Sequence, residues 1–133
     1  MEIKRDLYLN KLIRSMHNGM IKVVTGIRRC GKSYLLFNLL SNYLQTQGAD
    51  DEHIINVDLE DRRNKKLRNP DALLEYIDAR ITKEGMHYVM LDEVQWVDEF
   101  EDVLNSYLKI PNVDVYVSGA WNTHAIIVTS DLE

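Results

Sequence analysis

The chain's clearest chemical pattern is a run of eight residues, 26–33, that fits Gly-x-x-x-x-Gly-Lys-Ser without a mismatch. Gly26 and Gly31 permit backbone angles that turn successive N–H groups toward one concavity. A helix that starts directly after the loop would add its positive N-terminal end. The ligand that matches such a concavity is a polyphosphate.

The side chains of the same loop indicate a magnesium nucleotide, and we expect ATP·Mg²⁺. The ammonium group of Lys32 would reach the β- and γ-phosphates, and the hydroxyl of Ser33 would ligate Mg²⁺. For Arg28 and Arg29 three partners stay open: phosphate, solvent or a neighbouring acidic group. The segment that we expect to contact the nucleotide comprises Gly26, Ile27, Arg28, Arg29, Cys30, Gly31, Lys32, Ser33 and Tyr34.

Two carboxylates, Asp92 and Glu93, follow the largely apolar run 88–91, at what we expect to be the exposed end of a buried strand. Asp92 suits the Mg²⁺ shell, and Glu93 suits the orientation and deprotonation of an attacking water. An acidic pair after a strand is often only a solvated turn, but the strict glycine loop upstream favours the catalytic interpretation. A GTPase would need an Asn-Lys-x-Asp guanine reader, which the sequence lacks, and a small-molecule kinase would not need Glu93. The pattern therefore favours ATP hydrolysis.

Strands and helices alternate along the chain in the order that such a loop requires. Asn69 and Pro70 are typical of a helix start, and Gly48 is typical of a helix end. The buried side of the last helix should carry Val103, Leu104 and Leu108, together with Phe100. Apolar periodicity predicts a first helix that ends near 18–19, strands over 20–25, 54–57, 87–91 and 113–117, helices after the glycine loop, after 69–70 and over 97–109, and a fifth strand or a helical turn over 125–128.

Helices between successive strands imply parallel pairing through right-handed crossovers, which makes a three-layer α/β P-loop NTPase fold. In such sheets ligands bind beyond the carboxyl ends of the strands. Gly26, Asp58, Asp92 and Ser118 all fall at that edge, so we expect them to lie near one another. We assign residues 1–133 to one domain, with an N-terminal helix in 1–19 and the nucleotide-binding core in 20–133.

Composition narrows the class of protein. A hydrophobic fraction of 45% over 133 residues is enough for one globular core. The single cysteine and the lack of a long apolar run predict a cytoplasmic protein with no membrane partner. The net charge of −5 argues against a surface-wide footprint for nucleic acid. Basic residues gather in 4–14 and 62–68; solvated surface charge is the ordinary interpretation, and a local nucleic-acid patch stays open.

Three strings carry a more specific resemblance: 26–36 (GIRRCGKSYLL), 56–61 (NVDLED) and 91–95 (LDEVQ). Together they resemble the prokaryotic AAA-type ATPases, and among these the predicted ATPases with an AAA_14-like domain followed by a separate C-terminal domain. The resemblance covers nearly the whole chain to about Gly119. It implies an additional-strand P-loop fold in which the strand 113–117 lies between the strands that bear Gly26 and Asp92.

The resemblance also implies a γ-phosphate sensor after the strand 113–117, usually Gly-Ser-Asn. This chain has Ser-Gly-Ala-Trp-Asn over 118–122, so Ser118 or Asn122 is the candidate sensor. The arginine finger, lid and C-terminal domain of the family would follow Glu133, and we expect a truncated ATPase that takes its finger from a second copy or a protein partner. Because such a finger is worth about 10³ to 10⁵ in rate, turnover without it would be slow. The alternative is a nucleotide-dependent interaction module, or an inactive fragment, that binds ATP without significant turnover.

Other candidate residues give weaker signals. Packing in the core or at its rim is the ordinary interpretation of Trp96 and Trp121, with stacking on adenine or on a partner as the alternative. The four histidines show no metal-ligand spacing with one another or with Cys30.

Overall fold

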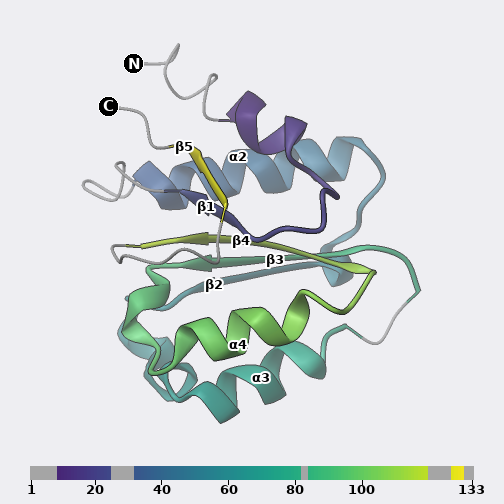
Figure 1. The fold of residues 1–133 in the computed structure, drawn as a ribbon. Coiled ribbons are helices and arrows are strands. Elements are labelled where there is room, and N and C mark those ends of the chain that lie inside the picture. The colour runs from purple at the N-terminus through teal and green to yellow at the C-terminus, as the bar shows by residue number, and fades with distance from the viewer. Residues whose placement is uncertain (1–8, 25–31, 82–83, 120–126, 131–133) are drawn as a thin grey trace.

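The computed structural model describes the backbone of residues 9–24, 32–81, 84–119 and 127–130, and side chains in all of these except 32–36 and 127–130. Within these residues a five-stranded sheet has the strand order β2-β3-β4-β1-β5, and every described pairing is parallel (Figure 1). The strands are β1 (Lys22–Val24), β2 (Ile54–Asp58), β3 (His87–Asp92), β4 (Val113–Ser118) and β5 (Ile127–Ser130). The strand β4 therefore lies between β1 and β3, as the resemblance implied.

Helices cover both faces of this sheet and make the three-layer α/β fold that the sequence predicts. The helix α2 (Lys32–Thr46) and the helical residues 9–14 lie on one face, and α3 (Pro70–Asp78) and α4 (Phe100–Tyr107) lie on the other (Figure 1). The side chain of Asn69 accepts a hydrogen bond from the Ala72 N–H at 3.0 Å and caps α3, as expected. Gly48 follows α2 with φ 102°, a conformation that favours glycine at a helix end.

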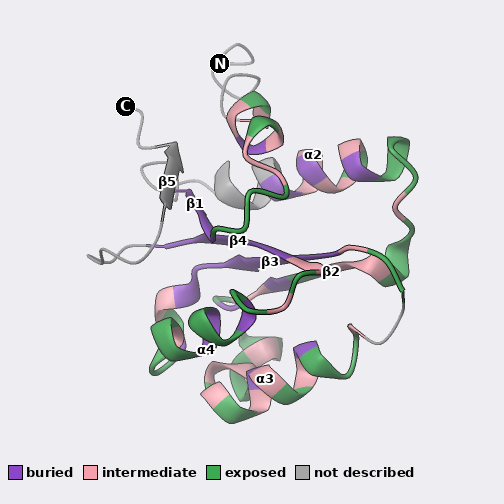
Figure 2. Cartoon of the chain, turned by 45° about the vertical axis from the view of Figure 1, so that its right-hand side comes forward, coloured by how far each residue is buried: buried purple, intermediate pink, exposed green. Residues whose placement is uncertain are grey.

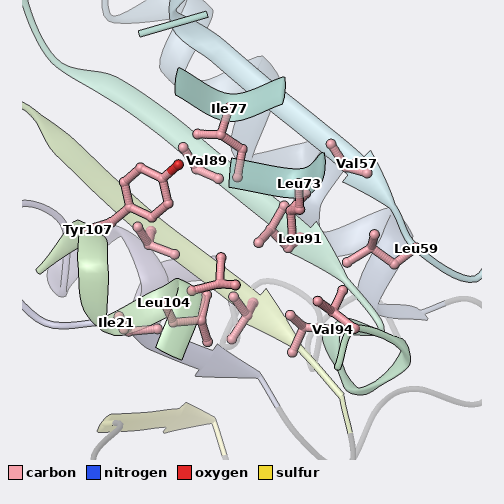
Figure 3. Close-up of a cluster of buried hydrophobic side chains, with 14 of the residues drawn as sticks. Ile21, Val57, Leu59, Leu73, Ile77, Val89, Leu91, Val94, Leu104 and Tyr107 are labelled. Carbon is pink, nitrogen blue, oxygen red and sulfur yellow. The ribbon is translucent and has the colours of Figure 1, made fainter. Parts of the chain in front are cut away.

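Each face of the sheet buries its own apolar cluster. One cluster joins the sheet to α3 and α4, where Leu73, Ile77 and Leu104 meet Val89 and Leu91 of β3 (Figure 3). The other joins the sheet to α2 and the helix 9–14; its members are Leu12, Val24, Phe37, Leu40, Leu44, Tyr88, Met90 and Tyr116. Alternate residues of β3 and β4 serve both clusters because successive side chains of a strand point to opposite faces. The central strands are consequently buried along their length (Figure 2).

A buried polar network fixes the amino-terminal edge of the sheet. The ammonium group of Lys22 on β1 donates to the carboxylate of Asp114 on β4, and neither residue exposes more than 3% of its surface. The same carboxylate accepts from the Tyr116 hydroxyl at 2.7 Å and from the backbone N–H of His17 at 3.0 Å. Lys22 also donates to the Met20 carbonyl at 2.7 Å. The network therefore ties the segment after the first helix to the two strands beneath it.

Several boundaries differ from those expected. The helix predicted over 97–109 is shorter in the structure, where α4 runs only from Phe100 to Tyr107 and a 3₁₀ turn, η4 (Val94–Trp96), precedes it. Leu108, expected on the buried side, lies beyond the end of α4 and is 40% exposed. The polar run after β2 contains a further 3₁₀ segment, η3 (Arg62–Arg68), which apolar periodicity does not detect because no residue in it is buried. A third 3₁₀ turn, η2 (Asp51–His53), precedes β2, and residues 127–130 form a strand rather than a helical turn.

Candidate functional site

The candidate site lies at the carboxyl edge of the sheet, where the strands end at matched levels. In the parallel registers Val24, the last residue of β1, pairs with Ser118, the last residue of β4. Asp58 at the end of β2 likewise pairs with Asp92 at the end of β3. The strand β1 ends at this edge, and α2, the next described element, begins at Lys32. Asp58, Asp92 and Ser118 therefore share the edge at which the glycine loop starts, as predicted.

Asp92, Glu93 and Ser118 are joined by hydrogen bonds. The backbone N–H of Glu93 donates to the Ser118 Oγ at 2.9 Å, and the Ser118 hydroxyl donates to Asp92 Oδ1. A hydroxyl can accept one bond and donate another, so Ser118 is suited to bridge an amide and a carboxylate. The bridge crosses from β4 to the end of β3 and fixes the position of the acidic pair relative to the strand that neighbours β1.

The sequence led us to expect the acidic pair at an exposed strand end, but the structure buries both residues. Asp92 is 4% exposed and Glu93 is 7% exposed. Carboxylates leave water at a high cost unless hydrogen bonds replace it, and here Ser118 and Gln95 supply such bonds. The amide of Gln95 donates to Glu93 Oε1 at 2.7 Å. A solvated turn is therefore the wrong interpretation of this pair.

Glu93 has an unusual backbone conformation. Its φ of 59° and ψ of 53° place it in the left-handed region, which residues other than glycine seldom adopt. The bond from its N–H to Ser118 and the bond from Gln95 to its side chain hold the residue on both sides. Strained backbone at a buried carboxylate is typical of functional sites. Sequence reasoning missed Gln95, because its spacing of two residues from Glu93 has no periodic signature.

The remaining predicted residues divide into two groups. Lys32, Ser33 and Tyr34 form the start of α2, and only their backbone is described. The expected phosphate loop, Gly26, Ile27, Arg28, Arg29, Cys30 and Gly31, and the candidate sensor Asn122 lie outside the described residues. Among the described residues no three histidine, cysteine, aspartate or glutamate side chains gather as a metal cluster.

Comparison with a family model decides the class of this domain. Residues 18–129 match the model of the AAA domain family AAA_14. The chain belongs to this family. An AAA-type nucleotide-binding domain thus occupies most of the sequence, and the recognition drawn from the three sequence strings is confirmed.

Two uncharacterized proteins match most of the chain. The chain is 29% identical over 119 residues to an uncharacterized protein of Haemophilus influenzae, covering 89% of this chain and 30% of that protein. It is 26% identical over 122 residues to an uncharacterized protein of Methanocaldococcus jannaschii, covering 89% of this chain and 24% of that protein. The chain therefore spans less than a third of the length of these relatives.

A solved structure shares the fold. The chain resembles, with a TM-score of 0.58 and 11% identity, a chain of the structure described as Drosophila ORC bound to DNA. The match covers 91% of this chain and 80% of the other. The likeness confirms the α/β architecture of the AAA domain.

No helix in the described part of the chain has the length and apolar character needed to cross a membrane.

Proposed function

We propose that this AAA domain binds ATP·Mg²⁺ and hydrolyses it by water attack on the γ-phosphate. The observation that carries the proposal is the buried cluster of Ser118, Asp92 and the Glu93 N–H at the carboxyl edge, beside the junction of β1 and α2. In the proposal residues 20–133 are the nucleotide-binding core, and the helix in residues 1–19 packs against it as part of the same domain.

Phosphate binding falls to the junction between β1 and α2. The glycine loop 26–31 and the backbone at Lys32 would direct N–H groups at the phosphates, and the first turn of the 15-residue helix α2 adds its positive end. Lys32 would contact the β- and γ-phosphates. The start of α2 at Lys32 is consistent with this assignment.

The donor set at the edge fits Mg²⁺. This ion prefers oxygen ligands, and the described part of the edge offers the carboxylate of Asp92 and the hydroxyl of Ser118. In the proposal Ser33 and Asp92 are the residues that would hold the ion. A bound Mg²⁺ would neutralise charge that develops on the phosphate oxygens.

Glu93 prepares the attacking water in this proposal. An ionised carboxylate has about four lone-pair sites, so Glu93 can bind a water in addition to Gln95, orient that water and take its proton. As the water oxygen bonds to the γ-phosphorus, the bond to the bridging oxygen of ADP breaks. Ser118, or Asn122 after it, would sense the γ-phosphate. A second copy of the chain or a protein partner would supply the arginine finger.

A phosphate-release assay with Glu93→Gln tests the catalytic part of the proposal. The variant should bind ATP·Mg²⁺ as the wild type does and lose turnover. The matched control is Glu101→Gln, which changes an exposed glutamate of α4 and should keep the wild-type rate. Wild-type turnover that rises more than linearly with protein concentration would support a finger supplied by a second copy. Retained turnover in Glu93→Gln would remove the role given to this residue, and binding without turnover in the wild type would favour the interaction module.

A further inference from the structure

A basic surface segment lies beside the candidate site, and the proposed ATPase function does not use it. The segment η3, residues 62–68, reads Arg-Arg-Asn-Lys-Lys-Leu-Arg and has no buried residue. Arg62, Lys65 and Lys66 are exposed and make no ion pair within the described part of the chain. Positive charge is thus concentrated here although the whole chain carries −5.

An exposed indole adjoins this positive charge. Trp96 of η4 is 45% exposed, and the guanidinium of Arg68 lies 4.0 Å from the centre of its ring. The structure holds Arg68 there, because its Nε donates to the Leu59 carbonyl at 2.9 Å and its Nη2 to the Glu60 carbonyl at 3.1 Å. Trp96 is therefore a rim residue with a fixed cationic neighbour, and a large part of its surface remains open to solvent.

Local geometry keeps the cations and the indole together. After a kink at Asn64 the segment continues for one turn of 3₁₀ helix, in which residues three apart share a side, so Lys65 and Arg68 lie on the same side. The Asp98 N–H donates to the Arg68 carbonyl at 3.3 Å and joins η3 to the loop that carries Trp96. Of the carboxylates nearby, that of Asp61 is engaged, because it caps η3 and contacts Arg63 at 3.4 Å, whereas Glu60 and Asp98 are exposed.

We propose that this surface, made of residues 62–68 and Trp96, binds single-stranded nucleic acid. Exposed lysines and arginines neutralise backbone phosphates, and an exposed aromatic ring stacks an unpaired base. A duplex would pair only with the positive charges, since its bases are already stacked on one another. An acidic peptide would likewise pair with the charges but would not stack on the indole. The proposal stands apart from ATP binding, because none of these residues belongs to the phosphate loop or the acidic pair.

Fluorescence anisotropy of a labelled oligothymidylate, without nucleotide, tests the proposal. Binding should weaken as salt rises, and Lys65→Glu should weaken it further and flatten the slope of log affinity against log salt by roughly 0.7 or more. The matched control is Lys109→Glu, an equal charge change at an exposed residue beyond the end of α4, which should leave the affinity nearly unchanged. Trp96→Ala should lower the affinity at least about fivefold, while Trp96→Phe should keep most of it.

Four outcomes would overturn the proposal. The first is no binding at low salt by protein that circular dichroism shows to be folded, and the second is an equal loss of affinity in Lys65→Glu and Lys109→Glu. The third is a duplex that binds as tightly as the single strand, with no effect of Trp96→Ala on the affinity. The fourth is a polyglutamate peptide that binds more tightly than the oligonucleotide. Because the assay contains no ATP, a failure here leaves the proposed ATPase function standing, and a failure of ATP binding leaves this result interpretable.

Discussion

The hydroxyl of Ser118 on β4 bridges the Asp92 carboxylate and the Glu93 N–H at the end of β3. Through this bridge the strand that pairs with β1 holds the acidic pair in place. Glu93 has a left-handed backbone, and its N–H donates to Ser118 in the same bridge. One hydroxyl thus couples the two strands on which the proposed chemistry depends.

Ser118→Ala should therefore cost both stability and activity. The substitution leaves a buried amide and a buried carboxylate without this partner, which costs about 1–3 kcal/mol in the free energy of unfolding. ATP turnover should fall more than ATP affinity does. Urea unfolding and phosphate release measure the two effects, with Ser106→Ala on α4 as the control, expected within about 0.5 kcal/mol of the wild type. A wild-type rate in Ser118→Ala would mean that the bridge has no catalytic importance.

Asp114→Asn should destabilise the fold by about 3–5 kcal/mol, because it leaves the buried Lys22 ammonium without its counter-charge. Burial lowers the pKa of Lys22 and the Asp114 carboxylate opposes that change, so the loss should shrink at alkaline pH as Lys22 deprotonates. Denaturant unfolding at pH 7 and pH 10 measures the loss.

The double variant Lys22→Met/Asp114→Asn tests whether the ion pair itself is responsible. It should be more stable than Asp114→Asn alone, because no unpaired charge remains buried. Additive losses would show that the two side chains act independently.

His87 should make the domain sensitive to acid. Its ring is fully buried with no hydrogen-bond partner for either nitrogen among the described residues, and its centroid lies 4.6 Å from that of His53. Burial, and secondarily His53, lowers the pKa of His87 below its usual 6.5. A lowered pKa means that the unfolded chain binds the proton more readily, so stability falls as the pH drops below about 6.5. In His87→Phe the loss of stability between pH 7 and pH 5 should be smaller, as measured by urea unfolding; an unchanged loss would exclude His87 as its source.

His53 should affect the pH dependence of stability in the opposite direction to His87. Its Nδ1 lies 2.6 Å from Asp50 Oδ1 and its Nε2 lies 2.7 Å from the Glu84 carbonyl oxygen. The bond with Asp50, and then that with Glu84, raises the pKa of His53. Its contribution is therefore fully present below about pH 6.5 and is lost as the pH rises through the raised pKa. His53→Asn should lose stability mainly at acid pH in the same urea series, and an equal loss at pH 8 and pH 5 would contradict this.

The sequence predicted the architecture because strand and helix periods are local signals. The apolar runs in β3 and β4, the cap at Asn69 and the glycine after α2 each specify an element without knowledge of its neighbours. Parallel pairing alone places the carboxyl ends of the strands at one edge of the sheet. For this reason Asp58, Asp92 and Ser118 could be expected at one edge before their contacts were known.

Contacts between distant residues could not be predicted in the same way. Lys22 and Asp114 each interrupt an apolar strand. A charged residue in such a strand indicates that it has a buried partner, but the sequence does not show which residue that partner is. The burial of Glu93 depends on Gln95 and Ser118, which carry no pattern of their own. The segment η3 lacks apolar periodicity, and α4 begins late because a 3₁₀ turn and a left-handed residue, Glu99, precede it.

Isothermal titration calorimetry with ATP·Mg²⁺ is the most direct test of nucleotide binding at the junction of β1 and α2. The wild type should give a saturable heat, Lys32→Ala should abolish it, and the control Lys109→Ala should retain it. A cooperative thermal transition in each protein would show that all three are folded. Folded wild-type protein that gives no heat with ATP·Mg²⁺, or a Lys32→Ala variant that binds as the wild type does, would contradict the proposed site.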